Sequence, residues 1–186
     1  MLSVISLQSD IQLGSITFGW RGRTLYREGH AGLSFLLFSP LMFLFRVLGA
    51  DMNYVVATCV LMVALSSIPD LDIQFEIKHR GVTHTLVFGV VIGILFGILM
   101  GYSYESMGWL MGFVAGFGGT ASHLVGDSFT YSKFQPFRPF SDKEIAFGFF
   151  KASNKTANGT MFVLGIVAFI ISYEPSIVAQ ILGSAY

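Results

Sequence analysis

Long runs of apolar residues alternate with short polar segments along most of this chain. A helix needs about 20 predominantly apolar residues to cross the hydrocarbon core of a bilayer, so each long run is a candidate membrane span. The last run is interrupted at Glu174. Either one kinked helix crosses the membrane here, or a shorter helix crosses and a second one lies at the surface, and we favour a crossing. The predicted spans are residues 30–49, 53–69, 84–102, 107–127 and a last one from Thr160.

The segments between the runs set the domain organisation. Residues 1–29 hold no apolar run long enough to span and no signal-peptide pattern, so we expect a retained surface segment there. Residues 30–186 then form a single transmembrane domain, with a polar, aromatic-rich loop at 128–159 before the last span. The pattern predicts an all-α fold, a polytopic transmembrane bundle of about five helices.

Composition agrees with a membrane protein and excludes several functions. Of the 186 residues, 53% are hydrophobic and only 12% are charged, which is typical of a polytopic membrane protein. The net charge of +0 gives no electrostatic basis for nucleic-acid binding. The one cysteine, Cys59, lies inside an apolar run, which excludes an intrachain disulfide and a zinc site built on cysteine.

Two predicted spans carry small residues at helical spacing. In the third span a glycine recurs every four residues, which gives one smooth helix face for close packing. The fourth span holds a similar set, and we expect the two faces to pack together. The first set is Gly89, Gly93, Gly97 and Gly101, and the second is Gly112, Gly116 and Gly119 with Ala115.

All four histidines, with several aspartates, stand at the ends of predicted spans. If successive spans cross in alternating directions, these ends face the same side of the membrane. Of the 11 Lys and Arg residues, only Arg46 sits near the opposite side, so the positive-inside rule places the shared side in the cytoplasm. The residues on this side are His30, Asp70, Asp72, His79, His84, His123 and Asp127.

The pair His123 and Asp127 has the spacing of a metal-binding pair. Residues four apart project from one face of a helix, so both can bind the same ion. A carboxylate beside imidazoles suits zinc, manganese or iron, whereas a soft metal would require sulfur. Taken alone, the same pair can also be a hydrogen-bonded pair at a helix end.

A second group surrounds the turn between the second and third spans. Asp70 and Asp72 follow a proline just past a predicted helix, where a carboxylate can bind an ion or orient an imidazole. We expect His79 on the loop and His84 at the start of the third span, with Thr83 as its N-cap. The alternative is a turn whose carboxylates are solvated.

Short motifs on these residues resemble a known family. They are GH at 29–30, PDLD at 69–72, HRGVTH at 79–84, SHLVGD at 122–127 and PFRPF at 136–140. Together they resemble the YdjM-like family of LexA-regulated, inner-membrane-associated proteins, which are described as metal-dependent hydrolases. The resemblance extends from about His30 to Ser141. It implies a hydrolase-like domain in the inner membrane and leaves the substrate open.

The segment from His123 to Asp127 is also distantly similar to one in the all-helical zinc phospholipase C and P1-nuclease group. There an H-x-x-x-D segment carries metal ligands, which implies hydrolysis of phosphate esters at two or three metal ions. This chain has few histidines and no N-terminal tryptophan that could ligate through its amine. We therefore expect a mononuclear or dinuclear site rather than a trinuclear one.

These features lead to one leading hypothesis, a membrane-embedded metal-dependent hydrolase acting on a phosphate ester of a lipid or other amphiphile. Zinc is the expected ion, with manganese or iron as alternatives, and membrane lipids are the expected partners. The metal would activate a bound water, and Arg80 would hold the phosphate or, alternatively, only anchor the loop at the membrane. The predicted ligands are His30, Asp70, His84, His123 and Asp127, with Asp72 and His79 completing or ordering them.

Two rival functions use the same residues. A transporter would use the cluster as an ion entry site, but the predicted spans hold only small or apolar residues and a few hydroxyls between their ends. A non-catalytic protein would use a structural metal, closed by protein ligands where an enzyme keeps one position open. The sequence alone does not separate an enzyme from a structural site.

Overall fold

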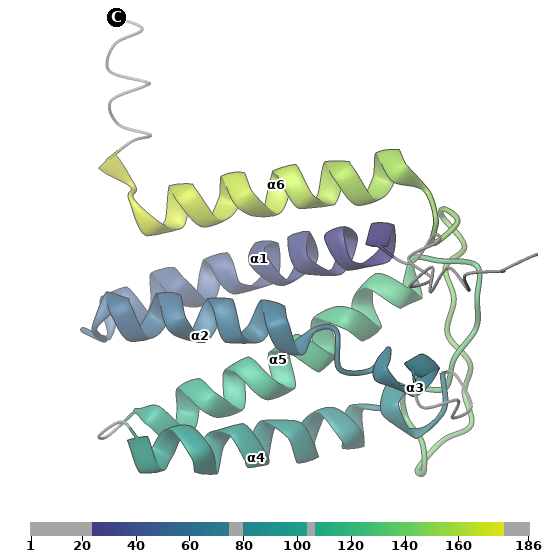
Figure 1. Ribbon diagram of the computed structural model, residues 1–186, viewed down its shortest axis with the longest axis horizontal. Helices are drawn as coiled ribbons and strands as arrows, with labels where there is room; N and C mark the ends of the chain where they lie inside the picture. Colours follow the sequence, from purple (N-terminus) through teal and green to yellow (C-terminus); the bar gives the residue numbers. More distant parts are fainter. Residues whose placement is uncertain (1–23, 75–79, 104–106, 177–186) are drawn as a thin grey trace, which may run out of the picture.

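The computed structural model describes residues 24–74, 80–103 and 107–176, and these residues form a helical bundle (Figure 1). Its described part contains no β-strand, only two isolated β-bridges in the loop after α5. The predicted all-α class is therefore confirmed. The elements are α1 (Thr24–Val47), α2 (Met52–Leu65), α3 (Leu71–Gln74), the 3₁₀ turn η1 (Val82–His84), α4 (Leu86–Ser103), α5 (Gly108–Ser128) and α6 (Lys155–Tyr173).

Three described helices, α1, α4 and α6, are long and apolar enough to cross a membrane. The helices at the other two predicted spans are not among these three. The second is the 14-residue α2, about 21 Å long, which ends at Leu65 because serines and Pro69 follow. The fourth is the 21-residue α5, whose glycines, hydroxyls and ionisable groups are tolerated because α1, α2 and α4 surround it.

Helix boundaries also depart from the predicted ones. Because α1 begins at Thr24, residues 24–29 are part of the first helix and His30 lies in its second turn rather than at its start. The last helix begins at Lys155, inside the predicted loop, and ends at Tyr173, ahead of Glu174 and Pro175. Most of the predicted N-terminal segment and the chain after Ser176 lie outside the described residues.

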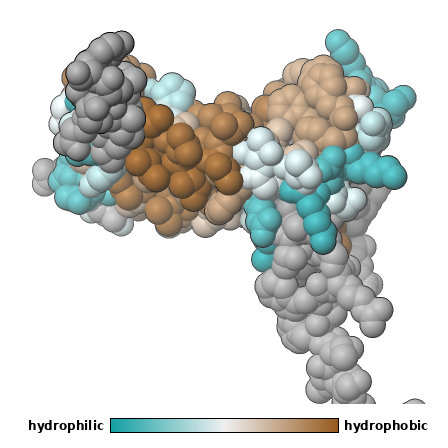
Figure 2. Space-filling view, turned by 90° about the horizontal axis from the view of Figure 1, so that it is seen from above, coloured by the Kyte–Doolittle hydropathy of each residue, from teal (hydrophilic) through white to brown (hydrophobic). Residues whose placement is uncertain are grey.

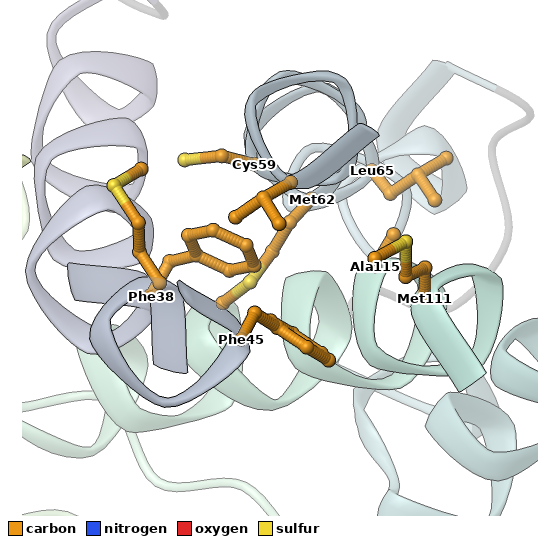
Figure 3. Packing of buried hydrophobic residues seen from close by; sticks show 9 residues of the cluster. Phe38, Phe45, Cys59, Met62, Leu65, Met111 and Ala115 are labelled. Atoms are coloured by element: carbon orange, nitrogen blue, oxygen red, sulfur yellow. The ribbon is translucent and has the colours of Figure 1, made fainter. Parts of the chain in front are cut away.

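The core lies where α1, α2 and α5 meet (Figure 3). Phe38 and Met42 of α1 are fully buried against Val55 and Cys59 of α2. Met111 of α5 closes the cluster from a third side. Burial of large apolar side chains between three helices fixes their relative positions, and with them the ends that carry the polar residues.

Close helix pairs flank this core. A Cβ on Gly112 would lie 2.1 Å from the carbonyl oxygen of Phe96, so glycine lets α5 touch the backbone of α4. In the α1–α6 pair, a Cβ on Gly165 would lie 2.0 Å from the carbonyl oxygen of Gly32. The predicted glycine face between the third and fourth spans is present, except that Gly119 packs on α2 and Ala115 belongs to the core cluster.

Polar and apolar surfaces separate along the bundle. Figure 2 shows an apolar band in its middle and hydrophilic residues at the end that carries the loop after α5. Apolar side chains such as Ile98 of α4 and Val163 of α6 are more than half exposed. Exposed apolar helix faces of this kind fit a lipid environment. The starts of α1, α4 and α6 and the ends of α2 and α5 all lie at the loop end (Figure 1).

Candidate metal centre

Two imidazoles form the middle of the site. His84 is the last residue of η1, His123 lies in the fifth turn of α5 and points toward it, and both rings are fully buried. Their Nε2 atoms are 3.3 Å apart and their ring planes are inclined at 73°. Two nitrogens bound to one tetrahedral zinc ion at about 2.0–2.1 Å lie about 3.4 Å apart, so the spacing fits a shared ion.

The other nitrogen of each ring is engaged. Nδ1 of His123 lies 2.8 Å from the carbonyl oxygen of Ser66, which can only accept, so this nitrogen carries the proton. Nδ1 of His84 lies 3.1 Å from the Thr83 hydroxyl, which itself donates to Asp72. In the neutral imidazoles, both Nε2 atoms are therefore acceptors, and they face each other.

Two carboxylates flank these nitrogens. Asp70 Oδ1 lies 3.5 Å from Nε2 of His123 and 3.8 Å from Nε2 of His84. Asp127 Oδ2 lies 3.4 Å from Nε2 of His84 and 3.7 Å from Nε2 of His123. Four acceptor atoms gathered in this way repel one another, and a divalent cation among them converts the repulsion into attraction. The chemistry of the donor set thus fits the predicted metal.

His30 stands beside this group. Its ring stacks on that of His123 at 4.0 Å, and its Nε2 lies 3.9 Å from Asp127 Oδ1. Nδ1 of His30 is buried without a hydrogen-bond partner among the described residues. His30 borders a cavity of about 20 Å³, enough for one water molecule. The close approach requires glycine at position 126, where a Cβ would lie 2.6 Å from that nitrogen.

The cluster can be read as two trios, His30–His123–Asp127 and Asp70–His84–His123, whose ligand atoms lie within 4.8 Å of one another. His123 belongs to both. Because its Nδ1 donates to Ser66, only its Nε2 can bind a metal, and one nitrogen serves one ion. The geometry therefore favours a single centre with up to five protein ligands.

Asp72 lies on the far side of His84 from the other carboxylates. Its Oδ2 is 3.4 Å from Nδ1 of His84, accepts the Thr83 hydroxyl at 2.9 Å and accepts the backbone N–H of Arg80 at 3.2 Å. A carboxylate in this place fixes the tautomer and the orientation of a ligating imidazole. Thr83 is thus a link to Asp72 and not the predicted N-cap. Thr85 caps α4, accepting from the backbone N–H of Phe88.

Arg80 joins the turn before η1 to the end of α5. Its guanidinium donates to Asp127 Oδ1 at 3.0 Å and to the carbonyl oxygen of Ser132. Its backbone has a φ of 61°, a left-handed conformation that is uncommon for any residue except glycine. The contacts to Asp72 and Asp127 hold this conformation, so Arg80 is already bound to the cluster and is not a free anchor at the membrane surface.

The structure thus brings seven of the eight predicted site residues together, and the eighth, His79, lies outside the described residues. The sequence interpretation missed the carbonyl of Ser66, which no side-chain pattern reveals. A signal was present in Pro69, since a helix that stops ahead of a proline leaves carbonyl groups without helical partners. Asp70 is the most open member of the cluster, with 30% of its side chain exposed.

The chain was compared with known proteins. The profile of one family, described as YdjM inner membrane protein, matches residues 26–185. Comparison with curated proteins and with solved structures found no match. The family match covers nearly all of the described helices, so it applies to the whole bundle and not to one motif.

Proposed function

The chain belongs to the YdjM inner membrane protein family, and we propose that it is a metal-dependent hydrolase acting on a phosphate ester of a lipid or other amphiphile. Its site lies at the end of a helical bundle with apolar outer faces (Figure 2). A reaction centre at this depth meets the headgroups of lipids rather than their chains.

The observation that carries the proposal is the set of four acceptor atoms, the two Nε2 atoms of His84 and His123 and one carboxylate oxygen each from Asp70 and Asp127. Carboxylates and neutral imidazoles are the ligands of zinc, manganese and iron sites that perform hydrolysis. Each imidazole is oriented from behind, His84 by Asp72 and His123 by the carbonyl of Ser66. Such support from behind is the usual arrangement of a preorganised metal site.

The residues divide the work of hydrolysis. A divalent ion held by Asp70, His84, His123 and Asp127 would polarise a phosphoryl oxygen and lower the pKa of a water molecule. The exposed side of Asp70 leaves a direction from which water and substrate can approach. Arg80 donates to Asp127 through Nη2 and to Ser132 through Nη1, and the N–H groups that these two contacts do not use can donate to a phosphate oxygen.

We further propose that the site faces the cytoplasm. The loop after α5 carries Lys133, Arg138 and Lys143, and Lys151 lies just before α6. At the opposite end of the bundle, Arg46 near the end of α1 donates to the carbonyl oxygen of Tyr173. Positive residues concentrate on the cytoplasmic side of inner membrane proteins, which supports this orientation.

The test is metal content followed by hydrolysis. We expect the detergent-purified wild type to bind about one divalent transition metal per chain, and His84→Ala and Asp127→Asn to lose it. Glu144→Gln is the matched control. Glu144 is a half-exposed acid in the loop after α5, and it pairs with Lys133 outside the cluster. The metal-loaded wild type should release phosphate or a phosphorylated headgroup from lipid phosphate esters. A folded wild type that binds no metal after reconstitution contradicts the proposal.

A structural metal site is the second candidate, because four protein ligands are enough to close a tetrahedral site. The same experiment separates the two functions. A structural site retains its metal and stabilises the fold, yet metal loading produces no hydrolysis of any lipid phosphate ester. The solvent exposure of Asp70 favours the catalytic site, since a closed structural centre needs no open side.

A further inference from the structure

A cleft of about 700 Å³ opens beside Arg80, between the start of α4 and the loop after α5. One part of its lining is polar and the other is apolar. Arg80 therefore borders both the metal centre and this cleft, through its contact with Asp127. The lining includes Arg80, Thr85, Gln135 and Arg138 on the polar side and Val82 and Val87 on the apolar side.

The polar part of the cleft favours an anion. Two arginines line it against one acid, Asp142, which accepts from Nε of Arg138 at 2.8 Å. This ion pair is exposed at both partners, 55% and 79%, so solvent weakens it and an incoming anion can compete. The terminal nitrogens of Arg138 donate no hydrogen bond within the described residues. A phosphate is the anion that suits a guanidinium fork.

The apolar part continues along α4. Val87, Val91, Ile94 and Ile98 recur at the spacing of one helix face and are 38%, 56%, 52% and 56% exposed. We call these four residues the α4 stripe. The stripe begins at the cleft, because Val87 belongs to both, and it runs toward the opposite end of the bundle.

The α4 stripe leads into a second hollow. A groove of about 700 Å³ lies between α4 and α5, which are adjacent in Figure 1, and Ile94 and Ile98 line it. Gly97 and Gly101 line it on α4, and Trp109 borders it from α5. Both glycines pack closely against Trp109, and the rest of the lining is mostly apolar, so the groove is a place for a narrow apolar ligand.

The dimensions match one leaflet of a bilayer. Ile98 comes eleven positions after Val87, which corresponds to about 16.5 Å of helix at 1.5 Å per residue. Half of a hydrocarbon core of about 30 Å is about 15 Å. A lipid whose headgroup lies in the cleft therefore has a chain long enough to reach the groove, and no longer than the stripe.

We propose that the cleft, the α4 stripe and the groove together bind one membrane lipid with an anionic phosphate headgroup. The phosphate lies between Arg80 and Arg138, and one acyl chain follows the stripe to the groove beside Trp109. This inference deepens the proposed function, on which it rests only for the claim that the bound lipid is the substrate. Binding itself needs no metal.

Fluorescence of Trp109 tests the path of the chain. The sequence has two tryptophans, so Trp20→Phe leaves Trp109 as the only one. We would titrate this protein, treated with chelator in phosphatidylcholine nanodiscs, with phosphatidic acid brominated near its chain ends. The comparison lipid is phosphatidylcholine carrying the same bromines. We expect phosphatidic acid to quench Trp109 saturably at a mole fraction about tenfold lower.

Variants locate the binding. Arg138→Gln should raise the half-quenching mole fraction about tenfold, the loss expected for one charge-assisted contact. Lys133→Gln is its control, because Lys133 is exposed on the same loop but does not line the cleft. Ile94→Ser should weaken quenching, whereas Leu99→Ser should not, since both residues are 52% exposed but Leu99 lies off the stripe.

The outcomes separate this inference from the proposed function. Equal quenching by both lipids, or quenching unaffected by Arg138→Gln, overturns the lipid site even where the metal-loaded protein hydrolyses a phosphate ester. Selective quenching by phosphatidic acid in a protein that hydrolyses nothing supports the lipid site and rejects the enzyme. Because the titration uses metal-free protein, loss of the metal centre does not affect its result.

Discussion

The Nε2 atoms of His84 and His123 lie 3.3 Å apart, although 39 positions separate the two residues in the chain. Each ring is held by a different element, His84 through Thr83 and Asp72 and His123 through the end of α2. The two nitrogens therefore meet because the end of α2, α3, η1 and α5 are packed together, and not because of any local motif. This arrangement places acceptor against acceptor, a repulsion that a bound cation would relieve.

Removal of metal should destabilise the wild type. Without a cation, the acceptors around His84 repel one another inside a buried cluster. An ion present at a thousand times its dissociation constant adds about 4 kcal/mol to the free energy of unfolding. We expect a chelator to lower the midpoint of thermal unfolding, followed by tryptophan fluorescence in micelles.

The double variant His84→Ala/His123→Ala provides the control for chelation. It lacks the pair of nitrogens, so its unfolding midpoint should be the same with and without chelator. If the chelator shifts wild type and double variant equally, the stabilising ion binds elsewhere. If it shifts neither, the cluster holds no metal under those conditions.

Asp72→Asn should weaken metal binding without abolishing it. Asp72 contacts His84 at Nδ1, on the opposite side of the ring from the proposed ion. Loss of such a supporting carboxylate typically costs about 10–100-fold in metal affinity. In competition titrations with a chromophoric chelator, the variant should reach the same stoichiometry at a higher metal concentration. Asp127→Asn should bind fewer metal ions per chain even at saturating metal. A similar loss in Asp72→Asn would mean that Asp72 is itself a ligand.

Much of the fold could be predicted from the pattern of apolar residues, because the bilayer demands long apolar helices with satisfied backbones. The prediction failed mainly at helix ends. The helix α2 stops early at the serines before Pro69, whereas α5, Gly108–Ser128, matches the predicted fourth helix to within one residue at each end. Helix starts were also misplaced, since α1 takes in polar residues from Thr24 onward.

The candidate site was predictable for a different reason. Ionisable residues are costly in an apolar chain, so the few histidines and aspartates at helix ends stood out. The sequence did not reveal their pairing, because the partners of His123 include the backbone of Ser66 and those of Asp127 include Arg80. Pro69 indicated that carbonyl groups at the end of α2 lack helical partners, but the identity of their partner and the left-handed backbone of Arg80 follow from three-dimensional packing.

Glycine at position 80 should have two opposite effects on stability. It relieves the left-handed backbone conformation, but it removes the side-chain contact with Asp127. The φ of 61° at Arg80 is easy for glycine but costs a residue with a Cβ about 1–2 kcal/mol. Arg80→Gly should therefore be more stable than Arg80→Ala by about that amount in denaturant titrations. Both variants lose the contact with Asp127. Equal stability of the two would mean that the turn relaxes to an ordinary conformation once the guanidinium is removed.

Substitution at the α4–α5 contact should destabilise the bundle from a distance. At Gly112 a Cβ would lie 2.1 Å from the carbonyl oxygen of Phe96, a backbone atom that moves only if α4 moves. Overpacking of this kind typically costs about 1–3 kcal/mol. We expect Gly112→Ala to lower the unfolding midpoint and to weaken metal binding, because α4 follows His84 directly.

Gly159→Ala separates close packing from helix propensity. Gly159 lies in α6, and a Cβ added there would meet no described atom within 4 Å, so alanine is free of steric conflict and gains about 1 kcal/mol of helix propensity. The same substitution should thus stabilise at one position and destabilise at the other. If Gly112→Ala raises the midpoint as Gly159→Ala does, helix propensity rather than the α4–α5 contact controls stability. That result would mean that the glycine contact between α4 and α5 does not position His84 against α5.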